Sequence, residues 1–189
     1  MKCTKRDLEI LEKQLGRKPR NVVEIATRCK NANPQVIVTA PILEKKDRVG
    51  IFPTTFWLTC PELNYRISKL ESKGLVQEIQ DEILSDEELS RQLEEAHKNY
   101  ANYRLNLVDK DRLEELKSNN YGQYKVLKDS GVGGILEFDG IKCLHTHYAH
   151  YLVDKSNPVG KKVDELLVEE YGTTEIEECC VDCSSSEED

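Results

Sequence analysis

One nine-residue stretch, residues 142–150, concentrates the side chains that could do chemistry. Its sequence, KCLHTHYAH, holds three of the four histidines and one of the seven cysteines of the chain. Thiolate and imidazole groups are ligands that zinc and other transition metals prefer. The same two groups can also act as a nucleophile and its base. The stretch therefore predicts either a metal site or a thiol-dependent reaction.

Helical geometry predicts which of these side chains share a face. At about 100° per residue, Cys143, His147 and His150 fall at i, i+4 and i+7 on one face. His145 is then expected to point away from Cys143. The preceding Asp139 is typical of a helix start, which would place Cys143 in the first turn. Free N–H groups and the helix dipole favour a thiolate at that position.

The composition is that of a globular chain with a highly charged surface. The 189 residues are 38% hydrophobic and 33% charged, with a formal net charge of −8. This acidic balance argues against nucleic-acid binding by the whole chain, since phosphate contacts require basic surface. No apolar run approaches the roughly 20 residues of a transmembrane helix, and the N-terminus lacks the apolar core of a signal peptide. We therefore expect a cytoplasmic protein with reduced thiols and no membrane partner.

Local patterns predict a single α+β domain over residues 1–172, in which a small antiparallel sheet of about three strands packs against several helices. Strand-like runs within the sheet region 21–60 cover residues 22–27, 35–40 and 52–59. Their linkers are too short for crossover helices, which favours antiparallel pairing. Residues 5–15 form an expected N-terminal helix, and residues 61–171 form an expected helical region.

Within the helical region, separate helices are expected over residues 61–73, 75–85, 86–107 and 111–117, and a last helix is expected to end near residue 171. Residues 121–126 are expected to be a strand or a loop. His97 lies in the charged middle of the 86–107 helix, where we expect a solvated side chain.

Two segments outside these elements also carry expectations. The basic connector RKPR, residues 17–20, is expected to be a solvated turn rather than a binding patch. Residues 173–189 form an acidic tail with three cysteines. Because this tail offers few apolar side chains to bury, we expect it to be disordered.

Several segments carry a pattern that is specific in its order and spacing. They are RC at 28–29, PQVIVTAP at 34–41, FPTTFWLTCP at 52–61, Leu70-Glu71 with Gly74, KCLHTHYAH at 142–150 and NPVG at 157–160. This pattern resembles the bacterial domain of unknown function 501 family, over roughly residues 19–167. The resemblance implies a bacterial, cytoplasmic, single-domain protein without an established activity. It also implies that Cys29, Cys60, Cys143 and the histidines belong to the family's pattern.

A metal-binding domain is the first functional hypothesis. Its expected ligands are Cys60, Cys143, His147 and His150, with Cys29 as an alternate. Zinc or another transition metal would be the cofactor. Four protein ligands would make a structural site, whereas three ligands and a water would make a reactive one. The alternative is a purely structural role, in which the cysteines pack as small hydrophobic residues and the histidines form hydrogen bonds in the core.

A thiol-dependent hydrolase or transferase is the second hypothesis. Cys143 or Cys60 would be the nucleophile at a helix N-terminus, and a neighbouring histidine, with His145 among the candidates, would be the base. Asn157 could orient that histidine or bind substrate. The third hypothesis is a non-enzymatic interaction module, in which the long charged helix over residues 86–107 presents a surface to a protein partner.

Overall fold

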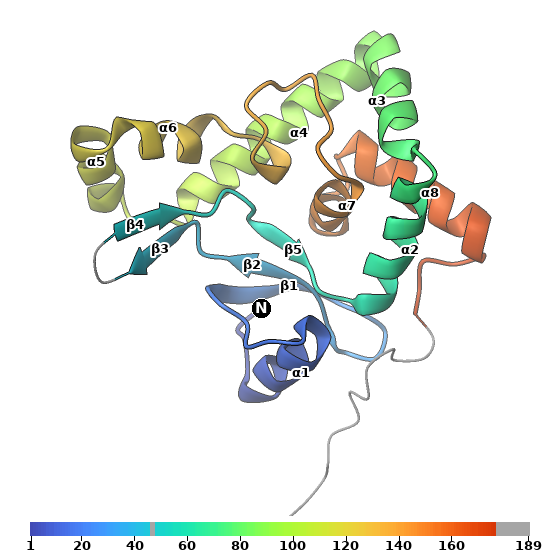
Figure 1. Cartoon of the computed structure of the whole chain (residues 1–189), viewed down its shortest axis with the longest axis horizontal. Helices are drawn as coiled ribbons and strands as arrows, with labels where there is room; N and C mark the ends of the chain where they lie inside the picture. Colours follow the sequence, from blue (N-terminus) through green and yellow to red (C-terminus); the bar gives the residue numbers. More distant parts are fainter. Residues whose placement is uncertain (46–47, 177–189) are drawn as a thin grey trace, which may run out of the picture.

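The computed structural model describes residues 1–45 and 48–176, and helices account for most of this part of the chain (Figure 1). The helices are α1 (Lys5–Leu15), α2 (Pro61–Ser72), α3 (Leu75–Ser85), α4 (Glu87–Asn106), α5 (Lys110–Asn119), α6 (Tyr121–Asp129), α7 (Leu144–Val153) and α8 (Pro158–Tyr171), with a 3₁₀ turn η1 (Val132–Gly134). None of these described helices has the length and apolar character needed to cross a bilayer.

The strands form two small antiparallel sheets. Strands β1 (Val22–Arg28), β2 (Pro34–Thr39) and β5 (Phe56–Leu58) pair in the order β1-β2-β5, and β3 (Ile42–Lys45) and β4 (Arg48–Ile51) form a separate hairpin. The α+β class and the three-stranded antiparallel sheet are confirmed. The hairpin adds two strands that the sequence analysis did not predict.

Strand β2 explains why the three-stranded sheet is covered on both faces. Val36 and Val38 are fully buried in the large core under the helices that follow β5, whereas Ile37 packs with Leu11 and Ile25 beneath α1. Successive side chains of a strand point to opposite faces, so a run of three apolar residues is buried only when both faces are covered. Figure 1 shows α1 on one side of this sheet and the other long helices on the opposite side.

Helix α1 begins with the capping box that its sequence predicts. The Thr4 hydroxyl accepts a hydrogen bond from the Asp7 N–H at 3.2 Å, and the Asp7 carboxylate accepts one from the Thr4 N–H at 2.9 Å. The same carboxylate also accepts a bond from Arg28 in β1, at 2.6 Å. Asp7 therefore completes the N-terminal cap of α1 and also joins this helix to the sheet.

Two local expectations in the helical region are wrong. Residues 121–126 lie in helix α6, which Asn120 caps by accepting a bond from the Gln123 N–H at 3.3 Å. His97 is fully buried rather than solvated. Its position is three residues before Tyr100 and seven before Arg104, so it belongs to the stripe of α4 that packs on the core.

The packed part of the chain extends past the predicted boundary at residue 172. Ile176 is buried in the main core, and the Thr173 carbonyl accepts a hydrogen bond from Arg66 at 3.0 Å. Residues 173–176, expected to belong to a disordered tail, therefore contact the main core and α2. The rest of the predicted tail, residues 177–189 with its three cysteines, lies outside the described residues.

Replacing Ile176 by Ala should lower the free energy of unfolding by about 2 kcal/mol, because a buried aliphatic side chain would be lost from the core. The cost should be at the low end of the usual range, since the end of a chain can relax into the space. Val168→Ala is the matched control, because Val168 is 46% exposed on α8. Urea denaturation measures both values, and equal stabilities for the two variants would contradict the docking of Ile176.

Candidate functional site

Cys143 lies immediately before α7 rather than within it. It is the N-cap residue of this helix, and its backbone is extended, with φ −157° and ψ 149°. The helical-face prediction is therefore wrong for Cys143, which does not lie on a helix face with His147 and His150. His145, which was expected to point away from Cys143, is instead its neighbour. The reason is that α7 starts one residue after Cys143. The thiol therefore lies beside the first turn of the helix, next to the Thr146 hydroxyl.

Three side chains from two distant segments converge at this helix start. Ligand atoms of Glu71, Cys143 and His145 all lie within 4.8 Å of one another. Glu71 is near the end of α2, and its Oε1 accepts a hydrogen bond from the Leu144 N–H at 2.6 Å. The same oxygen lies 3.1 Å from Nδ1 of His145. One carboxylate thus fixes both the start of α7 and the imidazole ring.

Glu71 is the member of this candidate site that sequence reasoning missed. In the sequence it stands out only as part of the family pattern, next to Leu70 and close to Gly74. Nothing in its local sequence connects it to Cys143, which lies more than 70 residues later. The one signal that could have indicated Glu71 is its place in the family pattern, as a carboxylate on an amphipathic helix.

The imidazole of His145 has an acceptor at each nitrogen. Nδ1 faces Glu71, and Nε2 lies 3.1 Å from the Asn64 carbonyl oxygen and 3.3 Å from the Ser68 hydroxyl. Burial acts to lower the pKa of His145, but its contacts with Cys143, Asn64 and Glu71 outweigh burial and raise the pKa to about 9. The ring is therefore held as a cation at neutral pH.

The pKa of the Cys143 thiol shifts in the opposite direction, downward. Burial acts to raise the pKa of this thiol, but hydrogen bonds from His145 and Thr146 outweigh burial, so the net shift is downward. The Thr146 hydroxyl lies 3.2 Å from the sulfur. A thiolate next to an imidazolium is the form that these two shifts favour together.

A pocket of about 250 Å³ opens onto this pair. Its wall combines the start of α7, one residue of α2 and the strand β5 with the residues before it: Cys143, His145, Thr146, Asn64, Thr54, Phe56, Trp57 and Leu58. The sulfur and the imidazole are therefore accessible to a small molecule, or to one group of a larger one.

His147 and His150 lie in the core, together with Asn157. The Asn157 amide nitrogen lies 3.0 Å from Nδ1 of His150 and 3.2 Å from Nδ1 of His147, while its oxygen accepts a bond from the Gly160 N–H at 2.9 Å. Asn157 therefore caps α8 and orients two buried histidines. It does not line the pocket at Cys143.

A third buried histidine completes this group, which we call the histidine cluster (His97, His147 and His150). The rings of His97 and His147 meet edge to face with centroids 5.6 Å apart. Burial lowers the pKa of His97 to about 4, of His147 to about 3 and of His150 to about 4. All three rings are thus neutral at pH 7.

The remaining predicted cysteine ligands do not belong to the group that contains Cys143. Cys60 is the N-cap residue of α2 and is buried in the main core, and Cys29 follows β1 in the turn to β2. In residues 1–45 and 48–176, the one group of cysteine, histidine and carboxylate side chains close enough to share a metal ion is that of Glu71, Cys143 and His145. The structure therefore does not assemble the four expected ligands, of which only Cys143 belongs to this group.

Comparison with known proteins identifies a family but no activity. Residues 25–165 match the family model described as "Protein of unknown function (DUF501)". No curated protein matches the chain, and no solved structure does. The matched segment includes Glu71, Cys143 and His145 and the pocket beside them. Because the match covers well over half of the chain, the protein belongs to the DUF501 family of proteins of unknown function.

Proposed function

We propose that the protein is a thiol-dependent enzyme, a hydrolase or a transferase, with Cys143 as its nucleophile. The observation that carries this proposal is the convergence of the Cys143 sulfur, the His145 imidazole and the Glu71 carboxylate, of which Cys143 and His145 line a pocket. A nucleophile needs a partner that holds its reactive form and a third group that orients this partner. Here His145 is the partner and Glu71 the orienting group.

The reaction would proceed in two displacements. The Cys143 thiolate would bond to an electrophilic carbon of the substrate, and the leaving group would depart with the proton of the His145 imidazolium. Water or a second acceptor would then attack the same carbon, returning its proton to His145 and releasing Cys143 as the thiolate. Water would make the protein a hydrolase, and an acceptor molecule would make it a transferase.

Two features of the site favour the reactive thiolate form of Cys143. The thiol lies at the N-terminus of α7, where the helix dipole stabilises negative charge. The Thr146 hydroxyl, 3.2 Å from the sulfur, can donate a hydrogen bond to the thiolate. Glu71 contributes by holding the cationic form of His145, since its carboxylate lies 3.1 Å from Nδ1.

Alkylation by iodoacetamide tests this proposal without knowledge of the substrate. At pH 7, Cys143 should react faster than free cysteine, and mass spectrometry of the tryptic peptides should identify it as the first modified residue. His145→Gln should slow its alkylation about tenfold, since a change of one pKa unit changes the thiolate fraction by that factor. Glu71→Gln should have a smaller effect, because Gln keeps the acceptor for the Leu144 N–H.

The control for these variants is Ser68→Ala, which removes a hydroxyl 3.3 Å from His145 Nε2 but leaves the Asn64 carbonyl in place. Its alkylation rate should match that of the wild type. If Cys143 reacts no faster than free cysteine, or if His145→Gln leaves the rate unchanged, the site does not activate the thiol and the proposal fails.

A metal centre on the same three side chains is the second candidate. The specific observation that favours it is the contact of 3.1 Å between Nε2 of His145 and the Asn64 carbonyl oxygen. Hydrogen bonds of this kind orient metal-bound imidazoles. Glu71, Cys143 and His145 would be the protein ligands of zinc or another transition metal, and the pocket would leave a position open.

Elemental analysis of protein purified without a polyhistidine tag separates the two candidates. Stoichiometric metal that is lost in Cys143→Ser, together with a Cys143 thiol that alkylates only after chelation, would support the metal centre. A metal-free protein with a fast-reacting thiol would support the nucleophile. The location that we propose is the cytoplasm, supported by the reduced thiols of Cys3, Cys29 and Cys143. A protein partner would contact the exposed charged face of α4.

A further inference from the structure

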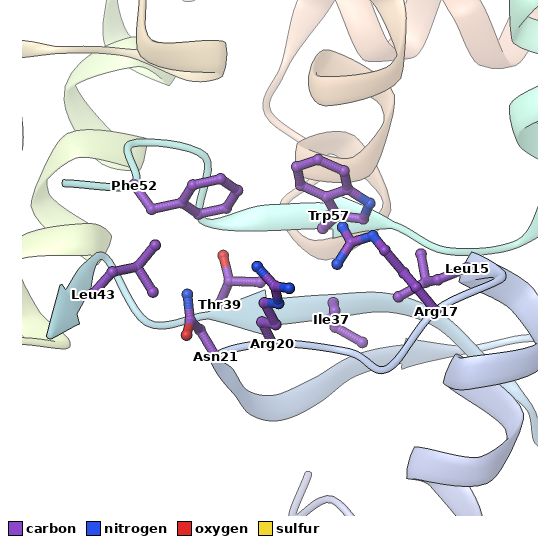
Figure 2. A pocket seen from close by; sticks show the side chains of 9 residues that line it. All are labelled: Leu15, Arg17, Arg20, Asn21, Ile37, Thr39, Leu43, Phe52 and Trp57. Carbon is purple, nitrogen blue, oxygen red and sulfur yellow. The ribbon is translucent and has the colours of Figure 1, made fainter. Parts of the chain in front are cut away.

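A second pocket, of about 280 Å³, lies on the α1 side of the three-stranded sheet (Figure 2). It is bounded by the connector between α1 and β1, by β2 and β3, and by the aromatic residues around β5. The lining residues are Leu15, Arg17, Arg20, Asn21, Ile37, Thr39, Leu43, Phe52 and Trp57. Only Trp57 also lines the pocket at Cys143, so this site is separate from the proposed thiol chemistry.

One wall of the pocket is aromatic. The rings of Phe52 and Trp57 are stacked, with centroids 5.7 Å apart and planes inclined by 24°. Ile37 and Leu43 add aliphatic surface beside them. A flat apolar wall of this kind suits a planar ring, which can bury its faces and stack on the aromatic side chains.

The opposite wall is basic. Arg17 and Arg20 are both exposed, and Figure 2 shows both guanidinium groups turned toward the two aromatic side chains. Neither has an ion pair or hydrogen bond with any residue that the structure describes. By contrast, partners are present for five other arginines, namely Arg28, Arg66, Arg91, Arg104 and Arg112.

The charge of the lining decides which ligand the pocket suits. It contains two arginines and neither aspartate nor glutamate, in a chain whose formal net charge is −8. Two like charges held together without a counter-charge repel one another, and an anion placed between them removes that repulsion. The planar guanidinium also matches the geometry of carboxylate and phosphate groups.

The backbone that carries these arginines is fixed at both ends. Gly16 ends α1 in the left-handed conformation, with φ 64°, and Asn21 precedes β1 with φ 56°. The Asn21 carbonyl accepts a hydrogen bond from the Ala40 N–H at 2.8 Å. The connector, expected from the sequence to be a solvated turn, is therefore attached to the end of β2 and directs Arg17 and Arg20 to the pocket.

We propose that this pocket binds a small planar aromatic anion. Its ring would lie against Phe52 and Trp57, and its phosphate or carboxylate would lie between the guanidinium groups of Arg17 and Arg20. The volume of about 280 Å³ is at the lower end of small-molecule sites, which limits the ligand to about the size of a mononucleotide. The inference goes beyond the proposed thiol reaction, because neither arginine takes part in it.

Trp57 makes the test direct, because it is the only tryptophan in the chain and it lines the pocket. Its fluorescence should be followed while the full-length protein is titrated with AMP, an aromatic phosphate, and with benzoate, an aromatic carboxylate. We expect a saturable change with one of them, and the one that binds more tightly identifies the anion. Adenosine and inorganic phosphate, which each lack one of the two features, should bind at least about tenfold more weakly.

The double variant Arg17→Gln/Arg20→Gln should weaken that binding at least about tenfold, because charge-assisted hydrogen bonds would be lost. Arg6→Gln, which removes an exposed arginine of α1 outside the pocket, should leave it unchanged. Because Trp57 also lines the Cys143 pocket, a signal that survives in the double variant would place the ligand there and overturn the proposal. The absence of saturable binding by both probes, or equal binding of adenosine or phosphate, would also overturn it.

Discussion

Lowering the pH from 7 to 5 should remove several kcal/mol from the free energy of unfolding, through the histidine cluster. His97, His147 and His150 are at most 2% exposed. Burial lowers their pKa values to about 4, 3 and 4, whereas an unfolded histidine has a pKa of about 6.5. Between pH 6.5 and 4, the unfolded chain therefore binds protons that the native protein does not.

The sign and size of the effect follow from this difference. The contribution of each histidine is complete above pH 6.5 and declines as the pH falls toward its native pKa. The slope is about 1.4 kcal/mol per pH unit for each ring. His145 acts in the opposite sense, because its pKa is raised to about 9. Its contribution is complete below pH 6.5 and is lost only as the pH rises through 9, so it does not offset the acid effect.

Urea denaturation at a series of pH values between 7 and 5 measures this slope. His97→Asn is the informative variant, because an asparagine oxygen can replace Nδ1 as the acceptor of the Val132 N–H, which lies 3.0 Å away. It should reduce the slope by about a third, whatever its effect on stability at pH 7. His145→Gln should leave the slope between pH 6 and 5 unchanged. A stability that is constant from pH 7 to 5 would show that the cluster is not neutral in the native protein.

The parts of the fold that sequence reasoning predicts well are those fixed by local patterns. Helix α1 has a capping box at Thr4 and a glycine after its last turn, and β2 has a continuous apolar run between prolines. The β3–β4 hairpin escaped prediction because its strands are only four residues long and carry charged residues. Such short strands pair through tertiary packing rather than through a strong intrinsic preference.

The candidate site shows a different limit. The sequence indicates the chemical capability of Cys143 and His145, but it predicts a helix start before Cys143, whereas α7 begins after it. Because Cys143 precedes the helix in an extended conformation, the helical spacing of 100° per residue does not apply to it. Glu71 lies on another helix, and no periodicity within residues 142–150 could indicate it. His97 was misassigned because its charged neighbours on α4 concealed the buried stripe that it shares with Tyr100.

The NPVG segment, residues 157–160, has a clear structural role at the contact between α7 and α8. Asn157 caps α8, and Pro158 occupies its first turn. Gly160 lies where α8 approaches α7 most closely: a Cβ atom there would be 2.2 Å from Cβ of Tyr151 and 2.6 Å from the carbonyl oxygen of His147. Both atoms are fixed to the backbone of α7, so they cannot move away by a change of rotamer.

Replacing Gly160 by Ala should therefore lower the free energy of unfolding by about 3 kcal/mol or more, because the methyl group can be accommodated only if the two helices separate. The same separation would stretch the bonds from Asn157 to the histidine cluster. Gly122→Ala in α6 is the matched control. The nearest atom to its Cβ would be the Asn120 Oδ1 at 3.8 Å, so the higher helix propensity of alanine should stabilise the protein by up to about 1 kcal/mol.

The free energies of unfolding of the two variants, measured by urea denaturation at pH 7, should thus differ from that of the wild type in opposite directions. A Gly160→Ala protein within about 0.5 kcal/mol of the wild type, the range of an ordinary surface substitution, would mean that α7 and α8 can separate freely. Because α7 carries the His145 side chain and begins next to Cys143, the alkylation rate of Cys143 in the same variant measures whether the helix contact also positions the proposed nucleophile. We expect that rate to fall in Gly160→Ala and to remain unchanged in Gly122→Ala.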